Sequence, residues 1–202
     1  MKTTGLRLYG KNDLRLESFK LPQIKADEVL FKVETNSICM SSHKAVIQGA
    51  DHKRVPKNIA DNPILIGHEM SGTILEVGET YKNKFKVGMK CTIQPAVSYP
   101  GKEHEAVGYS YEYIGGNATT VIVPSEALEM ECLIPCSGDS FYNVSLAEPV
   151  ACIIAAFKEQ FHYKNNNKYQ HEMGIVEGGN LAILGGGGPM GLAAVNVIKC
   201  RT

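Results

Sequence analysis

The chain has 202 residues, of which 44% are apolar and 21% charged, a composition typical of a globular protein. Its 21 basic residues equal its 21 acidic residues, which argues against a protein held to nucleic acid or to an anionic membrane by general charge. Six irregularly spaced cysteines are too few for a disulfide scaffold, and the N-terminus lacks the apolar core of a signal peptide, so we expect a cytoplasmic protein.

The first 150 residues are predicted to be rich in β-strands. Short runs of branched and aromatic residues are punctuated by Gly, Pro, Asn and Asp at the intervals of a barrel or sandwich. These runs are GLRLYG (5–10), DLRLESF (13–19), EVLFKVET (28–35), SGTILEVG (71–78), KCTIQP (90–95) and TTVIVP (119–124). The polar, tyrosine-bearing stretch between residues 94 and 116, called here the excursion, has no period and is interpreted as a long surface loop.

The pattern changes after residue 145. Apolar residues at helical spacing predict a helix over 147–161, and a polar surface stretch follows it. A strand is predicted over 180–184, leading into a glycine turn and a helix that starts at Pro189. The uncharged run 181–198 approaches a membrane-spanning length, but its glycines and proline would break one helix, so we reject a membrane span.

The glycine turn carries the first chemical motif. Gly186, Gly188 and Gly191 satisfy G-x-G-x-x-G, with Pro189 and Met190 between the last two glycines. Because the motif lies between a predicted strand and a predicted helix, its backbone N–H groups are expected to bind the pyrophosphate of a dinucleotide. The alternative is a turn that only packs a strand on a helix. The residue that reads the adenosine ribose would fall about 20 residues further on, past the last residue of the chain.

The pair His68-Glu69 is the second candidate. It does not belong to a zincin helix, because the second histidine that such a motif requires is replaced by Gly72. The pair offers an imidazole and a carboxylate to a metal, although the pattern alone favours His68 as a hydrogen-bonded turn residue. The isolated histidines of the chain are expected to be solvated; they are His43, His52, His104 and His162.

Four motifs in a fixed order carry a resemblance to a known family. Cys39 comes first, then Gly67-His68-Glu69, then the pair Glu148-Pro149 before a helix, and finally G-x-G-x-x-G. This order resembles the zinc-containing medium-chain alcohol and polyol dehydrogenases. The resemblance implies a mainly β GroES-like barrel domain over 1–150, followed over 151–202 by a linking helix and the first β-α element of a Rossmann α/β domain. On that basis the chain looks truncated.

The resemblance also implies a set of metal ligands. Cys39 and His68 fall on two ligands of the catalytic zinc, and Glu69 falls on the adjacent glutamate that binds or switches onto the metal. Glu148 falls where a further ligand comes from in the polyol branches. The residues alone favour a capping box, Ser145-x-x-Glu148, in which the glutamate bonds back to the serine, and only the family order shifts the preference to a metal ligand.

Other positions are assigned by the same resemblance. Ser41 falls on the residue that exchanges a proton with the substrate oxygen, and Lys44 on the end of the proton relay. Ser42 occupies a position where many members have an aspartate behind the zinc ligands, so that supporting role is in doubt. Because residues 92–131 contain no cysteine, we expect one catalytic zinc and no structural zinc.

The function implied is a zinc-dependent oxidoreductase that interconverts a ketose phosphate, of the L-sorbose 1-phosphate type, and a polyol phosphate with NAD or NADP. The resemblance to this subfamily rests on three stretches, which are KTTGLRLYGKNDLRLE, QGADHKRVP and GYSYEYIGG. Lys44, Lys53 and Arg54 are candidates for a phosphate seat, although a solvated basic loop is the alternative for the last two. We expect a small-molecule substrate, no nucleic-acid or membrane partner, and a homo-oligomer when the protein is full length.

Three alternatives stay open. The chain itself is expected to be inactive, so a non-catalytic zinc- or ligand-binding fragment is one of them. A dehydrogenase of another polyol or secondary alcohol is the second. A zinc-free reductase of the same fold is the third, and the joint presence of Cys39, His68 and Glu148 argues against it.

Overall fold

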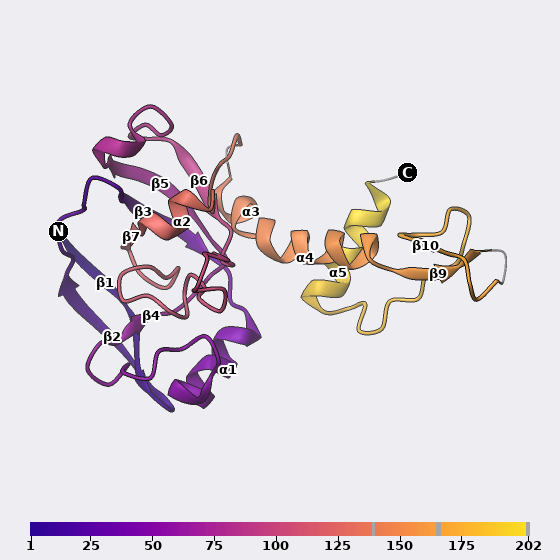
Figure 1. Cartoon of the computed structure of the whole chain (residues 1–202), viewed down its shortest axis with the longest axis horizontal. Helices are drawn as coiled ribbons and strands as arrows, with labels where there is room; N and C mark the ends of the chain where they lie inside the picture. Colours follow the sequence, from indigo (N-terminus) through magenta and orange to yellow (C-terminus); the bar gives the residue numbers. More distant parts are fainter. Residues whose placement is uncertain (139, 165–166, 201–202) are drawn as a thin grey trace. The chain divides into compact units, whose positions relative to one another are not determined.

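The computed structural model describes residues 1–138, 140–164 and 167–200, and it divides into two compact units (Figure 1). The first unit is Met1–Leu146 and the second is Ala147–Thr202. This division follows the contacts within each unit. The assignment of one domain to 1–150 and another to 151–202 stays a prediction.

The first unit begins with an antiparallel hairpin. Strands β1 (Lys2–Gly10) and β2 (Asp13–Lys20) are joined by a tight turn in which Asn12 has a φ of 58°. Asparagine is one of the few residues that tolerate this left-handed conformation in a turn. The short strand β4 (Ile64–Leu65) pairs with the other edge of β1 and completes a three-stranded sheet. The two predicted strands are confirmed, whereas β4 is too short to show a period.

A five-stranded antiparallel sheet forms the rest of the β-structure, in the order β7-β3-β5-β6-β8. Its strands are β3 (Val29–Asn36), β5 (Met70–Val77), β6 (Lys90–Ile93), β7 (Thr120–Val123) and β8 (Leu133–Pro135). Four of them match predicted runs, and β8 was not predicted because three residues carry too little pattern. Strand β3 pairs with β5 and β7, so the loop that leaves β3 and the loop that enters β5 lie on neighbouring strands.

The excursion is not the surface loop that the sequence suggested. Five of its apolar side chains are at most 2% exposed and belong to the two larger core clusters of the first unit. They are Val97, Ala106, Val107, Tyr109 and Ile114. The prediction was wrong because this segment packs as an irregular loop, so its buried residues follow neither the helical nor the strand period.

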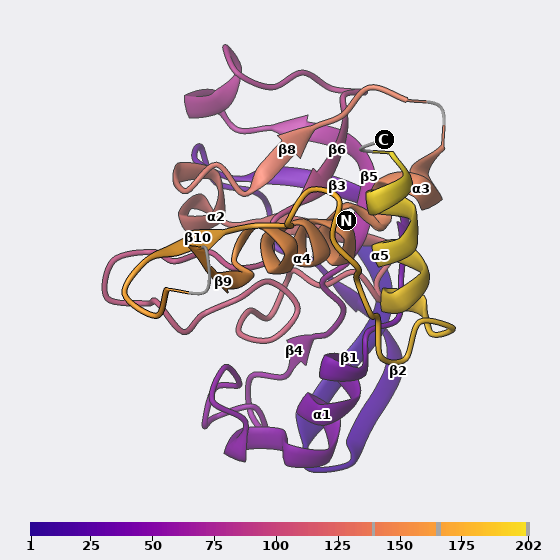
Figure 2. The same ribbon diagram turned by 90° about the vertical axis from the view of Figure 1, so that its right-hand side faces the viewer.

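Short helices fill the connections of the first unit. Helix α1 (Met40–Gln48) follows β3 and lies beside β1, as Figure 2 shows. The others are the 3₁₀ segments η1 (Gly49–Asp51) and η2 (Glu79–Tyr81), α2 (Ser125–Glu129) and α3 (Phe141–Ser145). The carbonyl of Phe141 in α3 accepts hydrogen bonds from Thr35 at 2.9 Å and from Ser71 at 2.6 Å, which ties this helix to β3 and β5.

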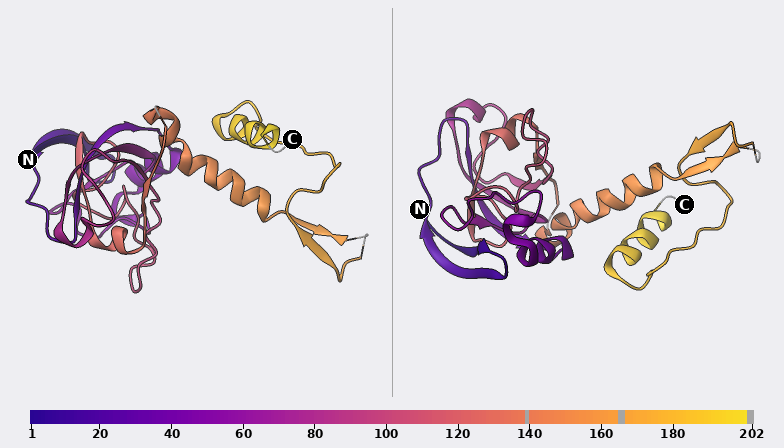
Figure 3. Two further views of the ribbon diagram at one scale, coloured as in Figure 1. Left: turned by 90° about the horizontal axis from the view of Figure 1, so that it is seen from above. Right: turned by 60° about the horizontal axis from the view of Figure 1, so that its bottom comes forward.

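The second unit contains helix α4 (Ala147–Lys158), a hairpin of β9 (Phe161–Tyr163) and β10 (His171–Met173), and helix α5 (Pro189–Lys199), all visible in Figure 3. The predicted helix over 147–161 is confirmed and ends three residues early. The hairpin forms inside the polar stretch that was predicted to lie on the surface. None of the helices that the structure describes is long and apolar enough to cross a membrane, which agrees with the rejected span.

The strand predicted over 180–184 is not formed, and this corrects the local assignment. A strand needs a hydrogen-bonded neighbour, and no described segment pairs with these residues. The glycine turn and the start of α5 at Pro189 are as predicted. A Cβ on Gly191 would lie 2.5 Å from the Gly185 carbonyl oxygen, so glycine is required where α5 packs on its own turn.

Candidate metal centre

Two loops bring the candidate ligands together. Cys39 lies at the N-cap of α1, just after β3, and His68 and Glu69 lie immediately before β5. Because β3 and β5 are hydrogen-bonded neighbours, the end of one and the start of the other lie side by side. The backbone N–H of Ser37 donates to the carbonyl of Glu69 at 2.9 Å and ties the two loops to each other.

Cys39, His68 and Glu69 form a metal-sized cluster. Their ligand atoms all lie within 4.8 Å of one another, and no other such group occurs in the described part of the chain. His68 and Glu69 are each 5% exposed, while Cys39 is half-buried. A thiolate, an imidazole and a carboxylate are ligands that zinc prefers, so the residues fit a zinc ion with one side open to solvent.

The protonation of His68 also suits a metal ligand. Burial lowers its pKa, the carboxylate of Glu69 opposes that shift, and the positive charge of Arg54 adds to it. The imidazole is therefore neutral near pH 7, which is the form that binds metals. For the same reason the 3.9 Å approach of His68 Nε2 to Glu69 Oε1 is a neighbour contact and not an ion pair.

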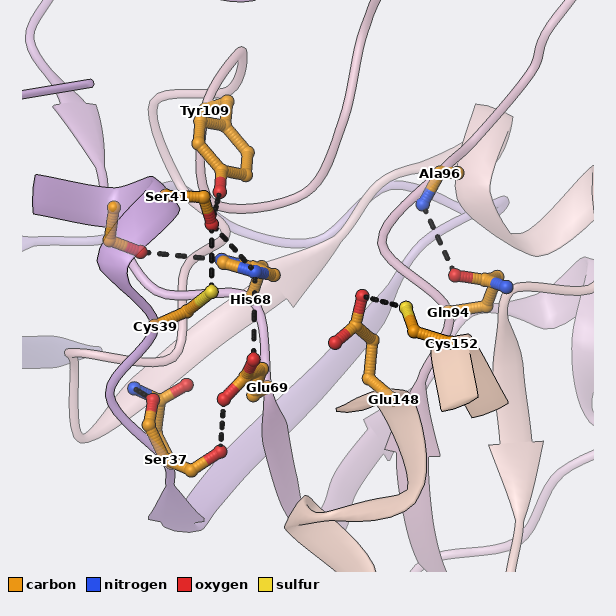
Figure 4. A network of polar contacts seen from close by, with 12 residues as sticks. Ser37, Cys39, Ser41, His68, Glu69, Gln94, Ala96, Tyr109, Glu148 and Cys152 are labelled. Carbon is orange, nitrogen blue, oxygen red and sulfur yellow. Dashed lines mark hydrogen bonds and ion pairs between the residues drawn. The ribbon is translucent and has the colours of Figure 1, made fainter. Parts of the chain in front are cut away.

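Serine hydroxyls contact the candidate ligands on the side away from the cluster (Figure 4). The hydroxyl of Ser37 donates to Glu69 Oε2, and Ser42 Oγ lies 3.3 Å from His68 Nδ1. The contact of Ser42 leaves Nε2 of the same ring free to face the thiol and the carboxylate. Ser42 thus takes the supporting position that the sequence left in doubt, and Ser37 was not predicted at all.

Ser41 connects the cluster to a buried tyrosine that sequence reasoning missed. Its hydroxyl donates to Cys39 Sγ at 2.9 Å and lies 2.7 Å from the hydroxyl of Tyr109 and 3.4 Å from His68 Nε2. Because the Ser41 proton points to the thiol, Tyr109 is the donor in the second contact. Burial raises the pKa of Tyr109, so its hydroxyl is protonated at neutral pH. No spacing in the sequence links Tyr109 to Ser41.

His52 is the second residue that the sequence misjudged. It is 9% exposed and stacks on Tyr109, with ring centroids 5.6 Å apart and planes 12° apart. Burial, reinforced by Arg54 and nearby lysines, lowers the pKa of His52. The expectation of a solvated histidine was wrong because the buried excursion supplies Tyr109 as a partner.

Lys44 does not enter the cluster, and Glu148 belongs to the other unit. Lys44 is exposed one turn further along α1, so its role in a proton relay stays a prediction. Glu148 lies in the first turn of α4, in the second unit, where Cys152 Sγ donates to its Oε1 at 3.6 Å. Ser145 belongs to α3 and its hydroxyl donates to the Tyr142 carbonyl at 2.8 Å, so it is not the N-cap that a capping box requires. Glu148 as a ligand stays a prediction.

The nucleotide motif lies entirely in the second unit. Gly188 is the N-cap of α5, with extended backbone angles, and Pro189 occupies the first turn. The open N–H groups at the start of this helix suit the negative charge of a pyrophosphate. The cofactor contacts predicted for Gly186, Gly188, Pro189, Met190 and Gly191 are not tested by this geometry.

Comparison with known proteins gives one consistent answer. The profile of the alcohol dehydrogenase GroES-like domain matches residues 25–131. L-sorbose 1-phosphate reductase of Klebsiella pneumoniae is 47% identical over 96% of this chain and 47% of its own length. Mannitol-1-phosphate 5-dehydrogenase of Aliivibrio fischeri is 46% identical over 96% of this chain and 45% of its own length.

A solved structure agrees on the fold. The crystal structure of 2R,3R-butanediol dehydrogenase from Bacillus subtilis matches 98% of this chain and 55% of its own chain with a TM-score of 0.68 at 22% identity. The chain spans about half the length of the curated relatives it matches. The matched domain, the mainly β fold and the ordered motifs agree: the chain belongs to the zinc-containing medium-chain dehydrogenase family and contains its GroES-like domain.

Proposed function

We propose that this chain forms the zinc-binding half of a cytoplasmic oxidoreductase that interconverts a ketose phosphate, of the L-sorbose 1-phosphate type, and a polyol phosphate with NAD(P)H. The observation that carries the proposal is the convergence of Cys39, His68 and Glu69 within 4.8 Å, with the Ser41 hydroxyl bonded to the thiol. The relatives named for L-sorbose 1-phosphate and mannitol 1-phosphate support a phosphorylated sugar or polyol. The complete enzyme is proposed to be a homo-oligomer.

In this proposal Cys39, His68 and Glu69 hold one catalytic zinc, and Glu148 supplies a further ligand. Zinc, when bound, supplies a Lewis acid for the substrate carbonyl. The neutral imidazole of His68 and the serine contacts to His68 and Glu69 keep these ligands oriented before the metal arrives.

Ser41 is the proposed proton donor to the substrate oxygen. Its hydroxyl lies next to the thiol of a proposed ligand and accepts a hydrogen bond from Tyr109. When Ser41 gives up its proton, the Tyr109 hydroxyl can replace it through the 2.7 Å contact. Lys44, exposed on the same helix, is the proposed end of this relay.

The glycine turn is proposed to bind the cofactor pyrophosphate through Gly186, Gly188, Pro189, Met190 and Gly191. Nicotinamide, when bound, supplies the hydride that the carbonyl carbon receives. The tight approach of Gly191 to Gly185 supports this role, because the third glycine of such motifs permits close packing of the helix on its turn.

A second candidate function rests on a separate observation. The chain spans about half of its relatives' length and, as described, has no parallel strand beside 180–184. A zinc- or ligand-binding chain without catalysis is therefore the alternative for these 202 residues by themselves.

The decisive experiment supplies the other half of a relative. The chain alone and a chimera that joins it to the C-terminal half of the Klebsiella pneumoniae reductase are assayed with L-sorbose 1-phosphate and NADH or NADPH. We expect no turnover by the chain alone and turnover by the chimera. Ser41→Ala should lower kcat in the chimera while its zinc content stays unchanged, and Ser41→Thr should retain most of the activity. A folded, zinc-loaded chimera that is inert with every ketose phosphate and polyol phosphate would refute the proposed function.

A further inference from the structure

Arg54 is a half-buried cation that no carboxylate among the described residues neutralises. Of the other described arginines, Arg7 lies 3.5 Å from Glu17 and Arg15 lies 2.7 Å from Asp13. Arg54 forms no such ion pair within the described residues, although its side chain is only partly exposed. A guanidinium presents a planar fork of donors that matches a phosphate group, and here that fork has not been used by the protein.

The position of Arg54 is fixed by contacts on both sides of its backbone. Its N–H donates to His52 Nδ1 at 3.2 Å, and its carbonyl accepts from Ser110 Oγ at 2.7 Å. Its guanidinium carbon lies over the ring of Tyr109, 5.6 Å from the centroid. The buried His52 also stacks on Tyr109, so Arg54 is held against the excursion before any ligand binds.

Tyr109 joins this cation to the reacting end of the site. Its hydroxyl lies 2.7 Å from Ser41 Oγ, while Arg54 lies over its ring. The proposed proton donor and the guanidinium therefore contact the same tyrosine side chain, Ser41 at its hydroxyl and Arg54 over its ring. An anionic group bound by Arg54 would lie close to the substrate oxygen to which Ser41 is proposed to donate a proton.

We propose that Arg54 binds the phosphate of the substrate, and that this phosphate is carried by the carbon next to the carbonyl. The inference rests on the proposed function and adds to it the residue that selects the substrate class. In a ketose 1-phosphate, one methylene carbon and one ester oxygen separate the carbonyl carbon from the phosphorus. In a ketose 6-phosphate, four carbon atoms and one ester oxygen lie between the carbonyl carbon and the phosphorus, so we expect its phosphate to fit Arg54 less well when the carbonyl is at Ser41.

The test measures binding, so it needs no turnover. Calorimetric titrations of the zinc-loaded chain use L-sorbose 1-phosphate, fructose 6-phosphate and unphosphorylated L-sorbose. We expect the 1-phosphate to bind about tenfold or more tightly than the other two sugars. Arg54→Gln should weaken binding of the 1-phosphate by about 10- to 100-fold and leave that of L-sorbose unchanged, since charge-assisted hydrogen bonds are lost. Arg54→Lys should fall between, because lysine keeps the charge without the fork.

Lys53→Gln is the matched control, because Lys53 is the adjacent cation but is exposed, which favours the solvated alternative given for it above. It should leave the affinity for the 1-phosphate unchanged. Equal losses in Arg54→Gln and Lys53→Gln, no loss in either Arg54 variant, or equal binding of the two sugar phosphates would overturn the inference. Zinc content is measured on the same samples. Absence of zinc from the wild type would refute the proposed function at the metal site. The effect of Arg54 on sugar-phosphate affinity is measured separately, so the two failures are distinguishable. Thermal melting of each variant ensures that a lost affinity is not lost folding, and Arg54→Lys keeps the test valid if Arg54→Gln unfolds.

Discussion

Gly108 allows the excursion to pack directly on the loop that carries His68. A Cβ at residue 108 would lie 2.1 Å from the carbonyl oxygen of Gly67, and the φ of Gly108 is +75°. Gly67 immediately precedes His68, and Gly108 immediately precedes Tyr109. We therefore predict that Gly108→Ala destabilises the chain and also moves the Tyr109 hydroxyl away from Ser41.

The cost divides into two parts. An alanine held at a left-handed φ loses about 1–2 kcal/mol relative to glycine. Overpacking against a backbone oxygen, which has no rotamer to adopt, adds about 1–3 kcal/mol. The expected loss for Gly108→Ala is thus about 2–5 kcal/mol. Gly101→Ala is the control, because Gly101 lies in the same excursion at a φ of +79° with no atom within 4 Å of its Cβ. It should lose only the first part.

Urea unfolding of the zinc-loaded chain measures both variants, with far-UV circular dichroism and tyrosine fluorescence as probes. The chain has nine tyrosines and no tryptophan, so the tyrosine signal is not masked. Midpoint shifts at constant m give the change in the free energy of unfolding. Equal losses for Gly108→Ala and Gly101→Ala would refute the close packing of the excursion on the His68 loop.

Three further predictions concern metal and cofactor. The folded chain should bind one zinc ion, and Cys39→Ser should lose most of it on dialysis because a thiolate ligand is removed; two zinc ions by elemental analysis, or full retention in the variant, would contradict the site. Glu148→Gln should weaken zinc binding with helix content nearly unchanged. If Glu148 only caps the helix, the variant should lose about 1 kcal/mol of stability or less and keep its zinc affinity. A zinc titration and a denaturation curve of the same variant distinguish the two roles. The 202-residue chain should not bind NADH or NADPH tightly, because the described residues supply a glycine turn without the paired parallel strands of a dinucleotide crevice; micromolar affinity in a fluorescence titration would disprove this.

Regular local patterns were sufficient to predict most of the elements. The hairpin of β1 and β2, the strands β3, β5, β6 and β7, and the helices α4 and α5 all follow from periodicity and turn residues. The failures are of two kinds. Strands β4 and β8 are too short to show a period, and the run over 180–184 has strand composition but no neighbour to pair with.

The candidate site divides in a similar way. The order of the motifs resembles a known family, and that resemblance identified Cys39, His68, Glu69 and Ser41 as candidates, whereas the pattern alone favoured His68 as a turn residue. The sequence does not give the distances between their ligand atoms, because these depend on the pairing of β3 with β5. The ligands come together because strand neighbours bring distant loops to one edge.

The surroundings of the cluster were decided by tertiary structure alone. Tyr109 and His52 are polar residues in polar stretches, and nothing in their spacing distinguishes them from surface residues. Gly108 lets the backbone of the excursion approach Gly67 in the His68 loop closely. That approach places the Tyr109 hydroxyl at Ser41 and gives Arg54 a ring to lie over. A residue's type states which chemistry it can perform, but its partners and burial depend on contacts between segments far apart in the chain.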